Sequence, residues 1–174
     1  MSFLSRIFGG RAERETYRPL YDRVVELGRN PAWYRDGQVP DTLDGRFDMV
    51  AAVLALVLLR LELEGEATSR ASVLIAELFI EDMEGTVRQI GVGDLMVGKH
   101  VGRMMGALGG RLSAFRGAIE TGEGFEAPVR RNVFHDAPPT EEAASFVSRR
   151  LERFWESLAQ TPAASVLAGK VPQP

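Results

Sequence analysis

Residues 49–59 read MVAAVLALVLL, an uninterrupted apolar run that begins after Asp48 and ends before Arg60. The run is too short to cross a bilayer, which needs about 20 residues. It is apolar all round, which is typical of a helix surrounded by other helices. We therefore predict a buried central helix over Thr42–Gly65 and, around it, an all-α, single-domain bundle of about six to seven helices.

The other helices are predicted from apolar residues at three- and four-residue spacing. They cover residues 13–27, 31–37, 69–83, 94–117 and 140–158, and the segment 125–139 reads as irregular or loosely helical. These segments define one helical domain over residues 13–160. We expect residues 1–12 to be a flexible or amphipathic N-terminus, and residues 161–174, with their three prolines among small residues, to lack fixed structure.

The composition excludes several kinds of site. The chain of 174 residues has no cysteine, which rules out disulfides, iron–sulfur clusters and thiolate metal sites. Its only histidines are His100 and His135, too few for a histidine-rich metal site, so we expect no metal and no cofactor. Its 21 basic and 24 acidic residues leave a net charge of -3, and we expect no specific nucleic-acid partner.

One segment has the outline of a phosphate-binding loop but lacks its chemistry. Residues 93–100, GDLMVGKH, match the pattern G-x-x-x-x-G-K-[ST] except at His100, which stands where a magnesium-binding hydroxyl is needed. No β-strand pattern precedes the segment, and the apolar positions after it continue at helical spacing. No serine lies in a nucleophile-elbow setting either. We expect neither nucleotide binding nor enzyme activity, and we assign no catalytic residue.

The same segment opens a predicted helix with glycines four residues apart: Gly98, Gly102, Gly106 and Gly110. Glycine in a helix interior costs about 0.5–1 kcal/mol relative to alanine, so four of them cost roughly 2–4 kcal/mol. Their missing side chains let a second helix approach closely. Two partners fit this stripe: a helix of a client protein, or the central helix of the same chain, crossing at Ala51, Ala52 and Ala55.

Residues around the stripe suit a client. Lys99 and Arg103 lie four apart beside the glycines, and Met96 adds a flexible, polarizable side chain of the kind that adaptable binding surfaces use. Acids before Gly85, where we expect a helix to end, are either simply solvated or available to a basic partner. The candidate client-binding residues are Gly98, Gly102, Gly106, Met96, Lys99, Arg103, Glu81, Asp82 and Asp94.

Two further features suggest contact with an anionic surface. At the N-terminus, helical spacing gathers four apolar side chains beside Arg6 and Arg11, namely Phe3, Leu4, Ile7 and Phe8. This segment either touches a membrane or is a terminus that frays or folds back on the core. Basic pairs at 130–131 and 149–150, together with Arg153, either contact RNA or anionic lipid or are solvated helix faces.

Several residues in the central half of the chain occur in a specific order. They are Arg88, Gly91-Val92-Gly93-Asp94, Val97-Gly98-Lys99 and Gly110-Arg111 within the run Phe79–Phe115, with Val39–Thr42 and the region up to Leu63 upstream. On these residues the chain resembles the ubiquinol–cytochrome c chaperone family.

The resemblance implies a helical assembly factor for respiratory complex III that binds newly made cytochrome b and has no enzyme activity. In mitochondria such factors work close to the ribosome and the inner membrane, so either surface is an expected contact. The chain has no long N-terminal extension, which favours a bacterial, cytoplasmic protein held loosely on the cytoplasmic face of the inner membrane. The alternative, from a different class, is a regulatory or scaffold domain that binds a soluble protein or an anionic membrane.

Overall fold

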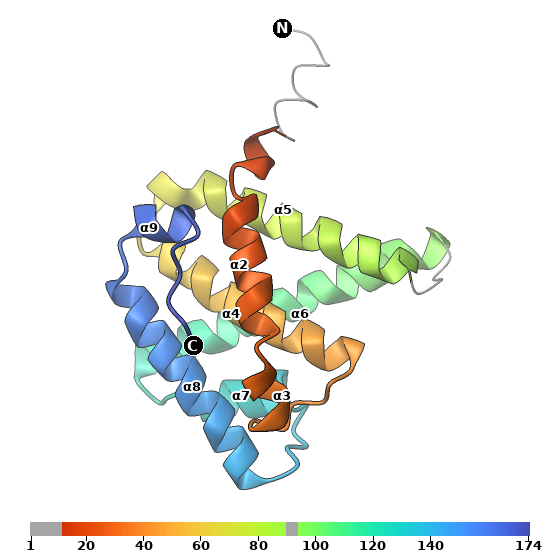
Figure 1. Cartoon of the computed structure of the whole chain (residues 1–174), viewed down its shortest axis with the longest axis vertical. Helices are drawn as coiled ribbons and strands as arrows, with labels where there is room; N and C mark the ends of the chain where they lie inside the picture. The colour runs from red at the N-terminus through yellow and green to blue at the C-terminus, as the bar shows by residue number, and fades with distance from the viewer. Residues whose placement is uncertain (1–11, 90–93) are drawn as a thin grey trace, which may run out of the picture.

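The computed structural model describes residues 12–89 and 94–174, and these residues form helices without any strand. The all-α prediction is confirmed, and the described ranges contain six helices of seven or more residues and two of five (Figure 1). In chain order the helices are α2 (Arg18–Gly28), α3 (Pro31–Arg35), α4 (Leu43–Glu62), α5 (Glu66–Gln89), α6 (Asp94–Thr121), α7 (Glu126–Asn132), α8 (Glu141–Gln160) and α9 (Ala163–Leu167).

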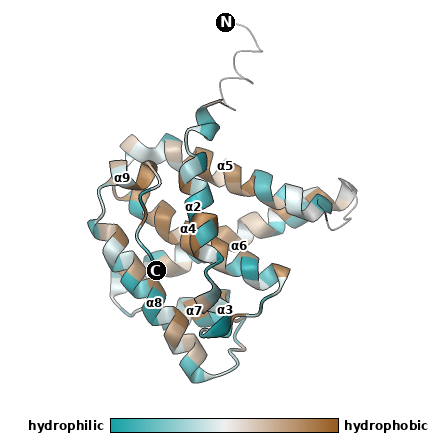
Figure 2. Cartoon of the chain, in the orientation of Figure 1, coloured by the Kyte–Doolittle hydropathy of each residue, from teal (hydrophilic) through white to brown (hydrophobic). Residues whose placement is uncertain are grey.

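Helix α4 is the centre of the bundle, as its apolar run predicts. It begins after Thr42, whose side-chain oxygen accepts a hydrogen bond from the backbone N–H of Gly45 over 3.1 Å. Every residue from Asp48 to Leu61 is buried, and α4 contacts α2, α5, α6, α8 and α9. The hydropathy colouring places apolar residues along α4 beneath α2 (Figure 2). Burial of its large apolar side chains, each stabilising by about 1.5–3 kcal/mol, holds the fold together.

Helix α2 crosses α4 at very short distance, and the glycine that permits this is Gly28. A Cβ atom built there would lie 2.6 Å from the Cα of Val50, closer than side-chain atoms pack. The carbonyl of Gly28 accepts a hydrogen bond from the Tyr34 hydroxyl over 2.9 Å, and the carbonyl of Leu27 accepts one from Trp33 Nε1 over 2.8 Å. These two bonds hold α3 against the end of α2.

Helices α5 and α6 form a long pair that leaves the bundle. Figure 1 shows the second half of α5 and the first half of α6 extending together away from α8, and we call these halves, residues 78–89 and 94–106, the arm. The predicted end of α5 near Met83 is wrong, because the helix continues through Gly85 to Gln89. One glycine costs a helix only about 1 kcal/mol, which packing against α6 offsets.

The C-terminal segment is ordered, so the expectation that residues 161–174 lack fixed structure is wrong. Pro162 is the N-cap of α9, where a missing N–H costs nothing, and Val166 and Val171 are buried. Buried Arg60 donates hydrogen bonds from Nη2 to the carbonyl of Thr161 over 2.9 Å and from Nε to that of Leu158 over 3.2 Å. The end of α4 therefore holds the turn between α8 and α9.

Candidate functional site

The glycine stripe of α6 is an open surface. We call it the glycine face, and an added Cβ would meet no atom within 4 Å at any of its members, Gly98, Gly102, Gly106 and Gly110. The alternative of internal packing against α4 is therefore wrong. Helix α6 reaches the core through another side, where Leu108 and Phe115 are buried. The close helix crossing of this fold occurs at Gly28 instead.

The predicted neighbours of the glycine face lie on the same exposed half of α6. Met96 is 46% exposed, which is unusual for a large apolar side chain, and Lys99 is exposed as well. Arg103 is exposed and lies with Nη2 2.8 Å from Nδ1 of His100. Asp94 is the first residue of α6, and its side chain lies outside the described part of the structure.

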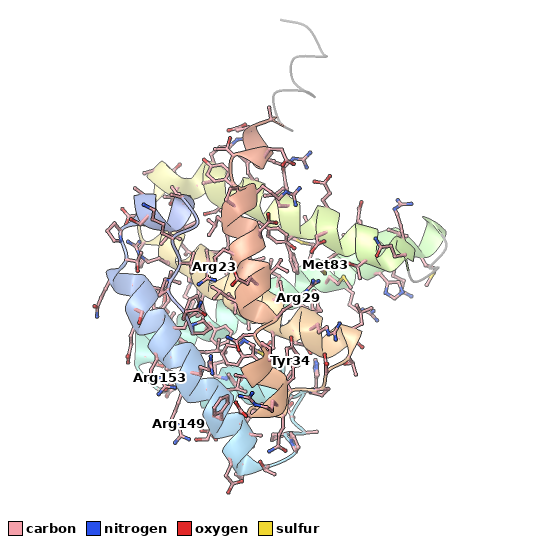
Figure 3. All side chains as sticks on the ribbon, in the orientation of Figure 1. Arg23, Arg29, Tyr34, Met83, Arg149 and Arg153 are labelled. Atoms are coloured by element: carbon pink, nitrogen blue, oxygen red, sulfur yellow. The ribbon has the colours of Figure 1, made fainter. Side chains whose placement is uncertain are left out.

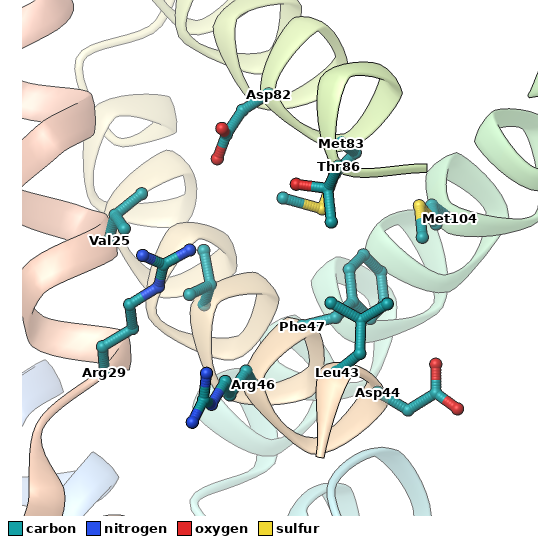
Figure 4. A pocket seen from close by; sticks show the side chains of 11 residues that line it. Val25, Arg29, Leu43, Asp44, Arg46, Phe47, Asp82, Met83, Thr86 and Met104 are labelled. Carbon is teal, nitrogen blue, oxygen red and sulfur yellow. The ribbon is translucent and has the colours of Figure 1, made fainter. Parts of the chain in front are cut away.

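A groove lined by methionines lies at the base of the arm, where α2, α4, α5 and α6 meet (Figure 4). Phe47 of α4, Met83 of α5 and Met104 of α6 line it, and the ring of Phe47 packs on that of Phe79 at a centroid distance of 5.7 Å. Charged side chains of both signs surround these apolar residues: Arg29, Arg46, Asp44 and Asp82. We call this hollow the methionine groove. Its mixture of polarizable and charged groups suits an amphipathic protein segment.

The methionine groove continues past Phe47 and Met104 into a second hollow, lined also by Arg103, Ala107 and His135. The two hollows have volumes of about 120 and 280 Å³. Pockets for drug-sized ligands usually span about 300–1,000 Å³, so these sizes suit individual side chains of a bound segment.

A buried ion pair lies under this second hollow and joins three helices. The guanidinium of Arg111 on α6 donates to the carboxylate of Asp48 on α4 and to the carbonyl of Asn132 on α7. Nη1 of Arg111 also donates to the carbonyl of Ala107 over 3.0 Å. The other carboxylate oxygen of Asp48 lies 2.8 Å from Nε2 of His135. Burial raises the pKa of Asp48 and lowers the pKa of Arg111, against the opposing effect of each partner's charge.

The structure separates the predicted client-binding residues into two surfaces. Arg103 and Asp82 line the methionine groove and its continuation. The glycines do not, because two residues correspond to about 200° of helix rotation, which places Gly102 and Gly106 nearly opposite Met104. Asp82 also accepts a hydrogen bond from the Tyr21 hydroxyl over 2.8 Å. One of its carboxylate oxygens is therefore already engaged within the chain.

The acids of α5 do not lie at the end of the helix, where the sequence pattern predicts them. Glu81 and Asp82 lie inside α5, whose last residue is Gln89, and not in its final turn. Glu81 is exposed and does not line the methionine groove. Its expected role with a basic partner stays a prediction.

The basic pairs differ in how far they are neutralised. Arg130 pairs with Glu126 over 3.1 Å and with Glu141. Arg150 is half-buried, with its guanidinium 5.0 Å from the ring centroid of Trp33. By contrast, Arg149 and Arg153 are exposed on α8, on the side of the molecule where α2 carries Arg23 and Arg29 (Figure 3).

The predicted membrane-contact residues Phe3, Leu4, Ile7 and Phe8 lie outside the described residues. Within residues 12–89 and 94–174, no helix combines the length and apolarity that crossing a membrane requires. In the same ranges, histidine and acidic side chains form no cluster of three or more that could hold a metal ion.

Comparison with known proteins shows which family the chain belongs to. The sequence profile described as ubiquinol–cytochrome C chaperone matches residues 35–172, which include Phe47, Met83 and Met104 of the methionine groove, the glycine face and the Asp48–Arg111 pair. The chain belongs to the ubiquinol–cytochrome c chaperone family. A comparison with curated protein sequences finds no match.

A solved structure supports the fold of this family member. The crystal structure of the Cbp3 homolog from Brucella abortus superposes with a TM-score of 0.80 at 23% sequence identity, covering 99% of this chain and 97% of that one. The bacterial origin expected from the sequence is consistent with this match. At this level of identity the likeness concerns the fold, and the surface chemistry of this chain is argued from its own residues.

Proposed function

We propose that this protein is an assembly chaperone of respiratory complex III that holds newly made cytochrome b. Its membership of the ubiquinol–cytochrome c chaperone family supports the assembly role. The observation that carries the client site is the glycine face, where a Cβ atom added at any of the four positions would meet no other atom within 4 Å. An exposed helix without such a role would be more stable with alanine at these positions.

The client would meet two surfaces, on opposite sides of α6. The glycine face allows a client helix to approach the backbone of α6 closely, with Met96 and Lys99 beside it, as small residues do where membrane helices pack. On the other side of α6, Phe47, Met83 and Met104 can adapt to apolar side chains of the same client. A hydrophobic segment that has not yet packed into its own complex has the chemistry that both surfaces need.

The test of the client site is a pair of matched leucine variants on α6. Gly102→Leu/Gly106→Leu adds side chains to the glycine face on the arm, whereas Gly117→Leu adds one to the same helix within the bundle. A Cβ atom at each of the three positions would meet no other atom within 4 Å, so both variants should fold. We expect the double variant to lose co-purifying cytochrome b and the control to retain it. Unchanged co-purification with a folded double variant would refute the site.

The assembly role is tested separately from the site. Deletion of the gene should lower the haem b absorbance of membranes and the activity of complex III, and the wild-type gene should restore both. Normal haem b absorbance and normal complex III activity in the deletion strain would refute the assembly role. Neither readout depends on which residues bind the client.

We also propose loose attachment to an anionic membrane surface, supported by the unpaired cations of the α2 and α8 side. Arg29, Arg149 and Arg153 form no salt bridge with any described residue. Electrostatic attachment weakens with salt, because ions screen it over about 10 Å at 0.1 M. Flotation with anionic vesicles at low and high salt tests this, with Arg149→Glu/Arg153→Glu as the variant. Binding that does not respond to salt or to the substitutions would exclude it.

A further inference from the structure

A second apolar hollow lies along the first half of α5, away from the methionine groove. We call it the α5 groove, and its volume is about 590 Å³. Leu58, Ala76 and Leu112 contribute apolar surface to it, Val73 forms one wall, and Glu62 and Glu66 add negative charge. Its size is within the range of sites that bury several large side chains.

Exposed apolar side chains mark this hollow as a surface that something covers. Val73 is 50% exposed and lines the groove, and Leu63, which is 66% exposed, lies in the chain between two lining residues, Glu62 and Gly65. Only two other large apolar side chains are exposed in the described ranges, Leu43 and Met96. Contiguous exposed apolar surface usually marks an interaction site.

The first described residues of the chain are fastened beside this groove. The carboxylate of Glu13 accepts two hydrogen bonds from the Arg70 guanidinium, over 3.1 Å from Nε and 2.6 Å from Nη2. Arg14 lies 3.8 Å from Glu77. Arg70 and Glu77 are the neighbours of Val73 at helical spacing, three residues before it and four after it. Residues 1–11 therefore start next to the wall of the α5 groove.

We propose that the N-terminal segment of the same chain covers the α5 groove, with Phe3, Leu4, Ile7 and Phe8 as its buried side chains. Their spacing places them on one face of a short helix. Eleven residues span up to about 36 Å when extended, whereas Arg70 and Ala76 are only about 9 Å apart along α5. Gly9 and Gly10 let the chain turn before Arg11.

Charge complementarity favours this occupant. The segment carries Arg6 and Arg11 and has no acid. Glu66 forms no salt bridge with a described residue, although it lines the groove, whereas Glu62 already pairs with Arg116 over 2.7 Å. Arg6 lies between the apolar pairs 3–4 and 7–8 of the segment. It supplies the positively charged partner that Glu66 lacks. A membrane or a second copy of the chain are the other occupants, and the experiments below separate them.

Disulfide trapping tests the contact directly, because the natural chain contains no cysteine. Phe8→Cys/Val73→Cys should crosslink within one chain at least about ten-fold faster than Phe8→Cys/Glu81→Cys. A docked segment holds the cysteine at position 8 close to position 73, which raises its effective concentration there. Glu81 is exposed on the same helix, within reach of the tether but outside the groove. Equal rates would overturn the proposal, and so would a disulfide that forms only between two chains.

Limited trypsin digestion gives a second readout on the full chain. A docked segment protects the bond after Arg6, since a protease cuts only the locally open form. Val73→Glu, at a half-exposed position that tolerates charge, should speed this cleavage by about five-fold or more. Met96→Glu, a matched change at an exposed methionine on the arm, should leave the rate unchanged. Cleavage of the wild type as fast as that of Val73→Glu would overturn the proposal.

Discussion

The imidazole of His135 lies against the buried carboxylate of Asp48, with 2.8 Å between Nε2 and Oδ2. His135 belongs to the loop between α7 and α8, and its side chain is 68% exposed, whereas that of Asp48 is 5% exposed. Asp48 is also the partner of buried Arg111. One exposed imidazole and one buried guanidinium thus hold the same carboxylate, and their contributions to stability should differ.

Asp48→Ala should lower the free energy of unfolding by about 3–5 kcal/mol, because it leaves the Arg111 guanidinium buried without its charge partner. His135→Ala should cost only about 0–1 kcal/mol, since polar contacts to an exposed side chain contribute little. Urea unfolding followed by circular dichroism measures both. Asp48→Leu/Arg111→Met, which removes both charges, should recover much of the loss. An Asp48→Ala protein as stable as the wild type would contradict the central role of this pair.

Gly102→Ala/Gly106→Ala should stabilise the protein, by about 0.5–1 kcal/mol at each position, because the new methyl groups enter open space on a helix. Gly28→Ala should do the opposite, since its methyl group would lie 2.6 Å from the Cα of Val50. Thermal unfolding of the variants measures whether each change raises or lowers the stability of the protein. If both glycine changes destabilise, the glycine face is not open in solution. A more stable double variant with weaker client binding would show that the glycines are kept for function.

Tyr34 should make the fold sensitive to alkali. Burial raises the pKa of its hydroxyl from 10.0 to about 12. Because the folded pKa is above the unfolded one, the stabilisation is complete below pH 10 and is lost as the pH rises toward 12. Tyr34→Phe should be less stable than the wild type below pH 10, and this difference should shrink above it. Urea unfolding of the wild type and of Tyr34→Phe across this pH range measures the difference in stability. A difference that does not change with pH would refute the raised pKa of Tyr34.

Val166→Ala should destabilise the protein by about 1–3 kcal/mol, because Val166 is fully buried at the end of the bundle. Removal of residues 162–174 should cost more, since it also removes buried Val171. Lys170→Ala is the control, because Lys170 is exposed and its loss should change stability by no more than about 0.5 kcal/mol. Wild-type stability after the truncation would mean that α9 does not pack in solution.

Local sequence patterns predicted most of the helices and could not predict what they contact. The apolar run of α4 is a local signal that the structure confirms, and the N-cap residues Thr42 and Thr140 mark where α4 and α8 begin. The Asp48–Arg111 pair joins residues 63 positions apart, and no spacing rule connects them. The available hint was that Asp48 directly precedes an apolar run, where a charge is expected to need a partner.

The errors at the ends of elements come from glycine and proline. Glycine is a weak helix breaker whose effect tertiary packing can override, as at Gly85 in α5. Proline breaks a helix interior but is tolerated at a helix start, so Pro162 permits α9 to begin directly after it. The glycine face shows another limit. Its spacing identified an unusual helix surface, but which side of α6 faces the core depends on Leu108 and Phe115 meeting the rest of the bundle.

The position of α9 also determines when this protein can fold during its own synthesis. Helix α4 is synthesised well before α8 and α9, which cover part of it. The ribosomal exit tunnel shields the most recently made stretch of a nascent chain, so part of the apolar surface of α4 stays uncovered until residues 163–171 have left the tunnel. Until then, the central helix of this bundle is open to aggregation.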